Sequence, residues 1–235
     1  MRSLAPFKTI HGMLTFWLFL AAFLPLLTFS AILIEQRTRF IKEEAFHKLE
    51  AIRDLKVESV NDWFNDTIIH LKAAASDETA HLIETVLAND QDDETLNHLR
   101  DVLKSFLALR TQFTEIMVLH PVSGKVLTST NPAHEREFRG NTSIFSEVSR
   151  QRDIFIQDIH YSTLVHGLRM SLAAPVFKDK EMGREMIGIM VADVRLEELN
   201  EVLQNRTGLG TTGETLIVNQ DVLAVNQLRW HGNAP

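Results

Sequence analysis

Residues 153–195 read DIFIQDIHYSTLVHGLRMSLAAPVFKDKEMGREMIGIMVADVR, and this stretch decides the fold. It holds three largely apolar runs, Asp153–Tyr161, Leu168–Phe177 and Met186–Arg195. Short runs of this kind, rich in branched aliphatic residues and bounded by polar turns, are typical of β-strands. The connection between the last two runs, Lys178–Arg184, is short, charged and contains a glycine, which favours a hairpin. The sequence therefore predicts three strands of an antiparallel sheet.

A second strand pair is predicted upstream. Phe113–His120 (FTEIMVLH) and Lys125–Thr130 flank the turn sequence PVSG, which is typical of a hairpin. Thr142–Arg150 suits a short helix between this hairpin and the later strands. After the last of the three strands, Leu196–Gln204 is predicted to be helical, and Glu214–Asn219 is predicted to form a further strand.

Residues 35–120 contain no proline or glycine, and apolar residues recur there at steps of mostly three or four. This spacing predicts a long amphipathic helix up to about residue 76. Ser76 then supplies a capping signal for a helix over residues 77–88, and a third helix is expected at about 94–109. Helices followed by hairpin-linked strands predict an α+β fold on an antiparallel, five-stranded sheet.

The stretch Met13–Ile34 (MLTFWLFLAAFLPLLTFSAILI) contains 22 residues without a charge. As a helix it would be about 33 Å long, enough to cross the hydrocarbon of a bilayer. A cleaved signal peptide is the alternative, but its apolar region is normally shorter, and Thr28–Ile32 is a poor cleavage site. We therefore expect an uncleaved membrane anchor that continues into the long helix.

The basic residues beside this span favour a cytoplasmic location for the C-terminal part of the chain. By the positive-inside rule, the side with more Lys and Arg is cytoplasmic. Two basic residues precede the span and four follow it closely, which taken alone would place the large C-terminal part inside: Arg2 and Lys8 before it, and Arg37, Arg39, Lys42 and Lys48 after it.

Composition narrows the function classes. The formal net charge of −7 and the lack of a dense basic stripe argue against nucleic acid. The chain has no cysteine, which excludes disulfides, thiol catalysis and cysteine metal sites. Residues 208–213 (GLGTTG) match GxGxxG, but a helix precedes and a strand is expected to follow, the reverse of a dinucleotide-binding turn. Since no HExxH, GxSxG or P-loop motif occurs either, we expect no catalytic site, no metal and no cofactor.

Polar residues inside the apolar strands are the remaining candidates for a functional site. One interpretation is the solvated face of a one-sided sheet. The other is a small polar pocket, in which an arginine binds a carboxylate and an acidic side chain accepts from an amine. The predicted ligand-binding residues are Arg139, Phe145, Asp158, His160, Arg169 and Ser171.

The order of these segments resembles the Cache family of extracytoplasmic sensor domains. The matching features are DIHYS (158–162), the turn glycine Gly167, AAPV (173–176), a charged hairpin and IGIMVADV (187–194) followed by a helix. TGLGTTGETLIVNQD (207–221) is similar to the start of the second module of a double Cache domain. The resemblance implies a PAS-like sheet that binds a small ligand, a periplasmic location, and hence a cytoplasmic N-terminus.

The same resemblance implies that the chain is the sensory, non-catalytic segment of a bacterial transmembrane receptor. We expect a two-component sensor histidine kinase, with a diguanylate cyclase or a methyl-accepting chemotaxis receptor as alternatives. A membrane-tethered dimerising scaffold that binds a protein is a further alternative. The expected partners are a carboxylate- or amine-containing metabolite, the membrane and a second copy of the chain. The family's amine-recognition motif has Arg followed by a Trp-Tyr pair, whereas Gly140 and Asn141 follow Arg139 here.

The predicted domain organisation has five parts. They are a cytoplasmic tail at 1–12, a transmembrane helix at 13–34, a signalling helix at 35–76, a membrane-distal Cache module at 77–205 and the start of a truncated membrane-proximal module at 206–235.

Overall fold

A computed structural model describes residues 10–89, 93–162, 167–178, 185–205, 207–219, 222, 224 and 226. Residues 1–9 of the predicted tail (1–12), residues 179–184 of the predicted connection Lys178–Arg184 and most of the chain after 219 lie outside the described residues. Contacts within the chain divide it into two units, residues 1–54 and 55–235. Each unit is described separately.

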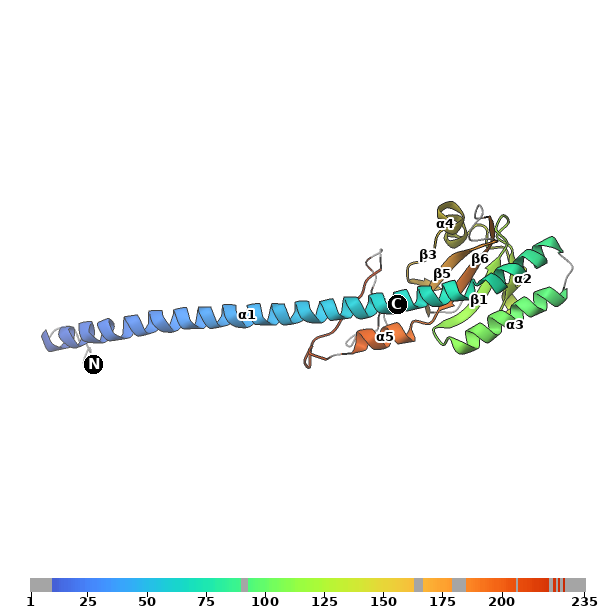
Figure 1. Cartoon of the computed structure of the whole chain (residues 1–235). Coiled ribbons are helices and arrows are strands. Elements are labelled where there is room, and N and C mark those ends of the chain that lie inside the picture. Colours follow the sequence, from blue (N-terminus) through green and yellow to red (C-terminus); the bar gives the residue numbers. More distant parts are fainter. Residues whose placement is uncertain are drawn as a thin grey trace, which may run out of the picture. The chain divides into compact units, whose positions relative to one another are not determined.

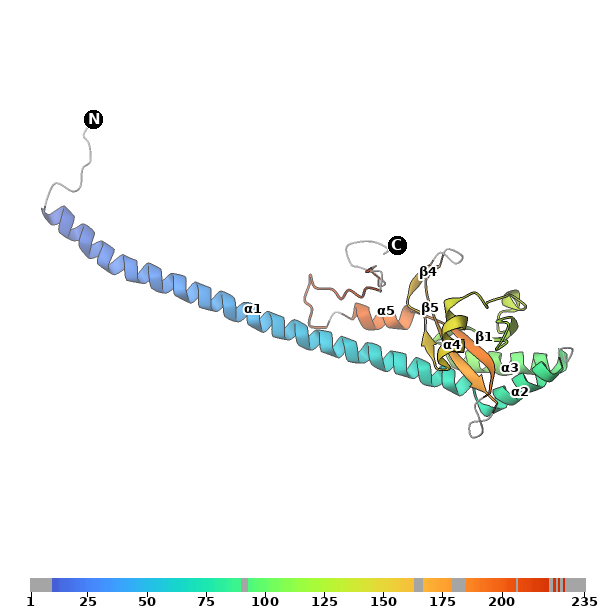
Figure 2. The ribbon, with the colours of Figure 1, turned by 90° about the horizontal axis from the view of Figure 1, so that it is seen from above.

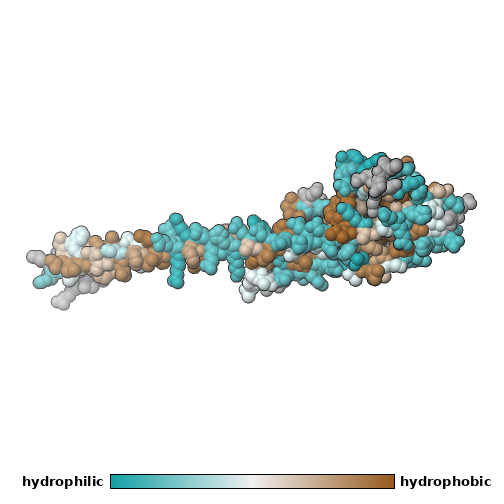
Figure 3. All heavy atoms as spheres, in the orientation of Figure 1, coloured by the Kyte–Doolittle hydropathy of each residue, from teal (hydrophilic) through white to brown (hydrophobic). Residues whose placement is uncertain are grey.

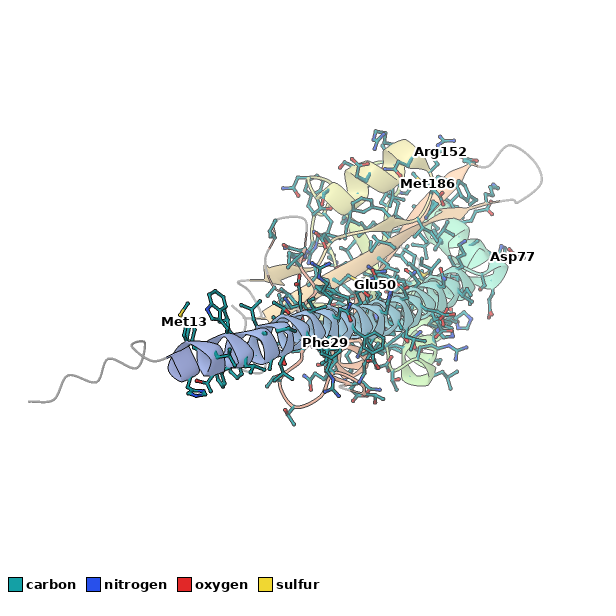
Figure 4. The ribbon with its side chains drawn as sticks, turned by 90° about the vertical axis from the view of Figure 1, so that its left-hand side faces the viewer. Met13, Phe29, Glu50, Asp77, Arg152 and Met186 are labelled. Atoms are coloured by element: carbon teal, nitrogen blue, oxygen red, sulfur yellow. The ribbon has the colours of Figure 1, made fainter. Side chains whose placement is uncertain are left out.

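The first unit consists of the N-terminal part of helix α1, which runs from Ile10 to Ala74. Its apolar stretch is long and hydrophobic enough to cross a membrane, and none of the most apolar window is buried. Hydrophobic side chains follow one another along this stretch and give way to hydrophilic ones (Figure 3). Met13 and Phe29, labelled in Figure 4, are 55% and 63% exposed. The helix continues through Pro25 and past residue 35 without a break. The predicted continuation of the apolar stretch into a long helix is therefore confirmed.

The second unit begins with the last turns of α1, from Leu55, and contains a sheet with flanking helices (Figure 1). The strands follow the order β2-β1-β6-β5-β3, all neighbours are antiparallel, and β4 pairs with β5 outside this path. The predicted α+β class with a five-stranded antiparallel sheet is therefore confirmed. The elements after α1 are α2 (Asp77–Ala88), α3 (Asp93–Leu109), β1 (Phe113–Leu119), β2 (Val126–Ser129), the 3₁₀ turn η1 (Pro132–His134), α4 (Ser143–Gln151), β3 (Phe155–Ile156), β4 (His160–Ser162), β5 (Gly167–Phe177), β6 (Met186–Val194) and α5 (Glu197–Gln204).

The two faces of the sheet carry separate apolar clusters. One cluster joins the sheet to the end of α1 and to α2 and α3, and includes Leu71, Ile83 and Leu103. The other joins the opposite face to α4 through Ile144 and Val148. The two views in Figure 1 and Figure 2 agree that α4 lies across the sheet from α2 and α3. Alternation along each strand therefore sends every second side chain toward α4.

Two strand predictions are corrected. The predicted strand Asp153–Tyr161 is divided into β3 and β4 by residues 157–159, which belong to neither strand, and there the Asp158 side chain accepts a hydrogen bond from the Ile159 amide. Glu214–Asn219 is not a strand, and its residue 218 forms only an isolated bridge. The side chain of Asn226 makes the hydrogen bonds that a neighbouring strand would make to this segment. Its oxygen accepts from the Ile217 amide, and its NH₂ group donates to the Thr215 carbonyl.

A lysine of α1 caps the C-terminal end of α5. The Lys56 ammonium donates to the carbonyls of Val202, Leu203 and Asn205, the last at 2.6 Å and Leu203 at 3.2 Å. These carbonyls lie at the end of α5, where no further helical turn can satisfy them and a cation is favourable. Burial lowers the pKa of Lys56. The contact connects α1 with the element that follows β6.

Candidate ligand-binding site

The strand register places polar side chains in one row on the α4 face of the sheet. Glu115 of β1 is paired with Asp193 of β6, and Asp193 is paired on its other side with Ser171 of β5. The next row on this face is apolar and includes Met117 opposite Val191. Directly opposed side chains on neighbouring strands have Cβ atoms about 5 Å apart. The face thus changes from charged to apolar within one step along the strands.

A cavity of about 240 Å³ lies over this change in polarity. Its walls come from β1, β4, β5 and β6, the 3₁₀ turn η1, the segment after β3 and the segment that leads into α4. The lining residues are Met117, Leu119, His134, Arg139, Thr142, Ile144, Gln157, His160, Arg169, Ser171, Val191 and Asp193.

Asp193 is the carboxylate that lines the cavity. Its Oδ2 accepts from Arg169 Nη1 at 2.9 Å, and its Oδ1 accepts from the Ser171 hydroxyl at 2.6 Å. The Asp193 and Arg169 side chains are 16% and 31% exposed. Each oxygen therefore has one partner in place, and the carboxylate keeps lone pairs for a further donor.

Glu115 lies beside Asp193 but is buried, with 4% exposure. Its carboxylate contacts His134 Nδ1 at 2.8 and 2.9 Å and accepts from the Ser129 hydroxyl at 2.6 Å. Like charges opposite each other on neighbouring strands repel. Glu115 and Asp193 are therefore stabilised side by side by separate hydrogen-bond donors, His134 and Ser129 for Glu115 and Arg169 and Ser171 for Asp193.

Arg139 reaches the cavity from the segment before α4. Its backbone amide donates to the Gly124 carbonyl at 2.8 Å, and its carbonyl accepts from the Thr142 hydroxyl at 2.7 Å. Thr142 is also the N-cap of α4. The Arg139 Nη2 donates to Glu137 at 2.6 Å, whereas its buried Nε has no hydrogen-bond partner among the described residues. Apart from the bond to Glu137, the N–H groups of this guanidinium have no hydrogen-bond partner among the described residues.

Four of the six predicted ligand-binding residues line the cavity: Arg139, His160, Arg169 and Ser171. Phe145 instead packs into the apolar cluster beneath α4. Asp158 is exposed, and its side chain accepts from the next backbone amide. The structure thus brings four of the residues together, and ligand binding by all six stays a prediction.

The sequence interpretation missed Asp193 and His134. Asp193 could have been found, since it is a lone carboxylate in the apolar strand MIGIMVADV and meets the criterion that selected Arg169 and Ser171. His134 had no such signal, because it lies in the irregular segment between β2 and α4. Its position depends on a contact with Glu115, 19 residues away in sequence.

A second cavity, of about 310 Å³, lies between the ends of α1, α2 and β5. Its charged side chains, Lys72, Asp77, Arg152 and Asp153, are all exposed. Among the described residues no cluster of three or more His, Asp or Glu side chains could hold a metal ion. The first cavity, with its partly buried charges of both signs, is therefore the better candidate for a ligand site.

No protein-family profile and no curated protein matches this chain. Among solved structures it is similar to the ligand-binding domain of the Pseudomonas aeruginosa amino acid chemoreceptor PctC in complex with GABA, at 16% identity over 76% of this chain and 73% of that chain, with a TM-score of 0.57.

The ligand-binding domain of the Pseudomonas fluorescens chemoreceptor CtaA is similar as well. Its complex with L-alanine matches at 14% identity over 77% of this chain and 71% of that chain, with a TM-score of 0.52. Its complex with L-serine covers 75% of this chain and 69% of that chain at 14% identity, with a TM-score of 0.50. These domains are sensor domains of the double Cache type. The resemblance seen in the sequence is therefore confirmed at the level of the fold.

Proposed function

We propose that the second unit is the small-ligand sensing domain of a membrane-anchored receptor, and that the cavity beneath α4 binds an amino-acid-like metabolite. The observation that carries this proposal is the cavity itself, which is lined by charges of both signs, Arg139 and Arg169 against Asp193, beside an apolar wall. Residues 77–205 correspond to the proposed membrane-distal module, with the second module starting near 206.

The contacts suggest how such a ligand would be held. Arg139 lines the cavity, and its guanidinium makes only one side-chain hydrogen bond among the described residues, to Glu137. Arginine is well suited to bind a carboxylate. Asp193 retains acceptor capacity for an ammonium. The cavity volume is below the range of about 300–1,000 Å³ typical of drug-sized ligands, which favours a molecule of few heavy atoms. The PctC and CtaA domains carry GABA and small amino acids, respectively, which supports this ligand class.

The first prediction concerns Arg139. Isothermal titration of the detergent-solubilised chain with a panel of L-amino acids, GABA and small dicarboxylates is expected to find at least one binder. Arg139→Met should weaken that binder about tenfold or more, because the carboxylate loses a charged donor.

The matched control is Arg150→Met on α4. Arg150 is 68% exposed and does not line the cavity, so affinity should be unchanged. Silence of the entire panel, together with tight dimerisation or capture of a specific protein partner, would favour the scaffold alternative instead.

The proposed output is a methyl-accepting chemotaxis receptor. The histidine kinase expected from the sequence has less support, because the structures similar to this chain are chemoreceptor domains. Ligand binding would then favour one of two arrangements of the sensing domain and so bias α1, which requires different affinities for the two arrangements. Dimerisation through α1 remains part of this proposal.

The sensing domain is proposed to be periplasmic, with the N-terminus in the cytoplasm. Alkaline phosphatase fused to the C-terminal end of the chain is therefore expected to be active in intact cells. This enzyme needs the disulfides that form only outside the cytoplasm. Activity of a β-galactosidase fusion at the same position, with a silent phosphatase, would reverse the orientation as the basic residues after the span suggest.

A further inference from the structure

His134 is held in the cavity wall by a contact that determines which of its ring nitrogens carries a proton. Nδ1 lies 2.8 and 2.9 Å from the two oxygens of Glu115. An ionised carboxylate can only accept, so Nδ1 must donate, and a neutral imidazole then has Nε2 as its acceptor. The amide of Asn131 also approaches Nδ1, but at 3.5 Å, which is too long to compete with the carboxylate.

The segment that carries His134 is fixed on its other side too. Glu135 accepts from Arg100 of α3 at 2.6 and 3.0 Å, through Nε and Nη2. Neighbouring residues of this turn are thus held by β1 and by α3. His134 is 33% exposed on its side chain and lines the cavity. Because Nδ1 is taken by Glu115, Nε2 is the ring nitrogen that remains for a ligand in this cavity.

The ammonium and carboxylate of an amino-acid ligand leave Nε2 of His134 without a hydrogen-bond partner. In the proposed binding mode, Arg139 takes the carboxylate and Asp193 takes the ammonium, which uses both charged ends of the ligand. Nε2 of His134 would then lose its water on ligand binding without gaining a partner, and an unpaired polar group is unfavourable. A ligand whose side chain donates a hydrogen bond removes this penalty.

We infer that His134, positioned by Glu115, is a specificity-determining residue that selects ligands with a hydroxyl or amide donor on the side chain over their apolar isosteres. This inference rests on the proposed function of the cavity. A site with a dedicated hydrogen-bond partner rejects an analogue that lacks the matching group, because its own polar atom is left unpaired.

Two pairs of amino acids test it, L-threonine against L-valine and L-serine against L-alanine, titrated into the solubilised chain. The wild type is expected to bind the hydroxylated member of each pair about tenfold more tightly. Threonine and valine have nearly the same shape, so their ratio reports the hydrogen bond and not cavity volume.

Two variants separate ligand contact from structural support. The amide of His134→Asn ends where Nδ1 lies, so it can donate to Glu115 but presents nothing at the position of Nε2. The amide of His134→Gln reaches the position of Nε2 but leaves Glu115 with the Ser129 hydroxyl alone. We expect H134N to lower both ratios to about one at a near-native Tm, and H134Q to keep part of the preference at a reduced Tm.

Equal wild-type affinities within each pair would overturn the inference and leave the proposed function standing. The inference would also be overturned if H134N kept the wild-type affinity ratios, or if it lowered the affinities for threonine and valine by the same factor. If the wild type binds none of the four amino acids and none of the wider panel, the proposed function fails along with it.

Discussion

Asp193→Asn is expected to weaken an amino-acid-like ligand by about a hundredfold, the largest effect on binding of any single substitution in the cavity. The ligand ammonium would lose its counter-charge, and Arg169 would be left as an unpaired cation beside it. Truncating one member of a desolvated charge pair typically costs about 2–5 kcal/mol of binding free energy. The measurement is isothermal titration with the best binder of the panel.

Asp158→Asn is the matched control, since Asp158 is the carboxylate that the sequence favoured. It is exposed, and its hydrogen bond to the Ile159 amide can be kept by the asparagine oxygen. Affinity should remain near the wild-type value. A loss of binding in D158N with none in D193N would move the amine site from β6 to the segment before β4.

Gly124→Ala is expected to produce the largest loss of stability among substitutions in the turns, about 3 kcal/mol in the free energy of unfolding. Gly124 has φ +69°, which L-residues other than glycine adopt at a cost of about 1–2 kcal/mol. An added Cβ would also lie 2.6 Å from the Gly140 nitrogen, and such overpacking adds about 1–3 kcal/mol. Chemical denaturation followed by circular dichroism measures the change.

Binding should fall with stability in G124A, because the Gly124 carbonyl positions the Arg139 amide next to Gly140. Gly210→Ala is the control: Gly210 has the same φ of +69°, yet an added Cβ meets nothing within 4 Å. It should cost only the conformational penalty of about 1–2 kcal/mol and leave affinity intact. Equal losses in both variants would show that close packing against Gly140 plays no part.

The fold could be predicted from the sequence because local signals agree with it. The helix spacing before residue 77, the cap at Ser76 and the apolar runs of β5 and β6 each indicate one structure. The predictions were wrong where side chains of distant residues determine the backbone. Asn226 occupies the hydrogen bonds that a strand at 214–219 would need, and a single sequence does not reveal such a contact.

The candidate site was predicted only in part, for a related reason. Periodicity shows that Arg169 and Ser171 share a face, but strand register decides that Asp193 lies opposite Ser171. His134 enters the cavity only because Glu115 binds it. Phe145 was selected for its place in the short helix, and its apolar ring packs against the cluster beneath α4.

The opposed carboxylates of Glu115 and Asp193 restrict how sequences of this kind can diverge. Each is held by its own donor, His134 or Arg169, so losing either donor leaves two carboxylates facing each other across β1 and β6 with one stabilising contact fewer. Substitutions in this row should therefore be inherited as pairs, Glu115 with His134 and Asp193 with Arg169. A change of ligand preference would then require two coordinated mutations, and the intermediate with only one of them would be less stable.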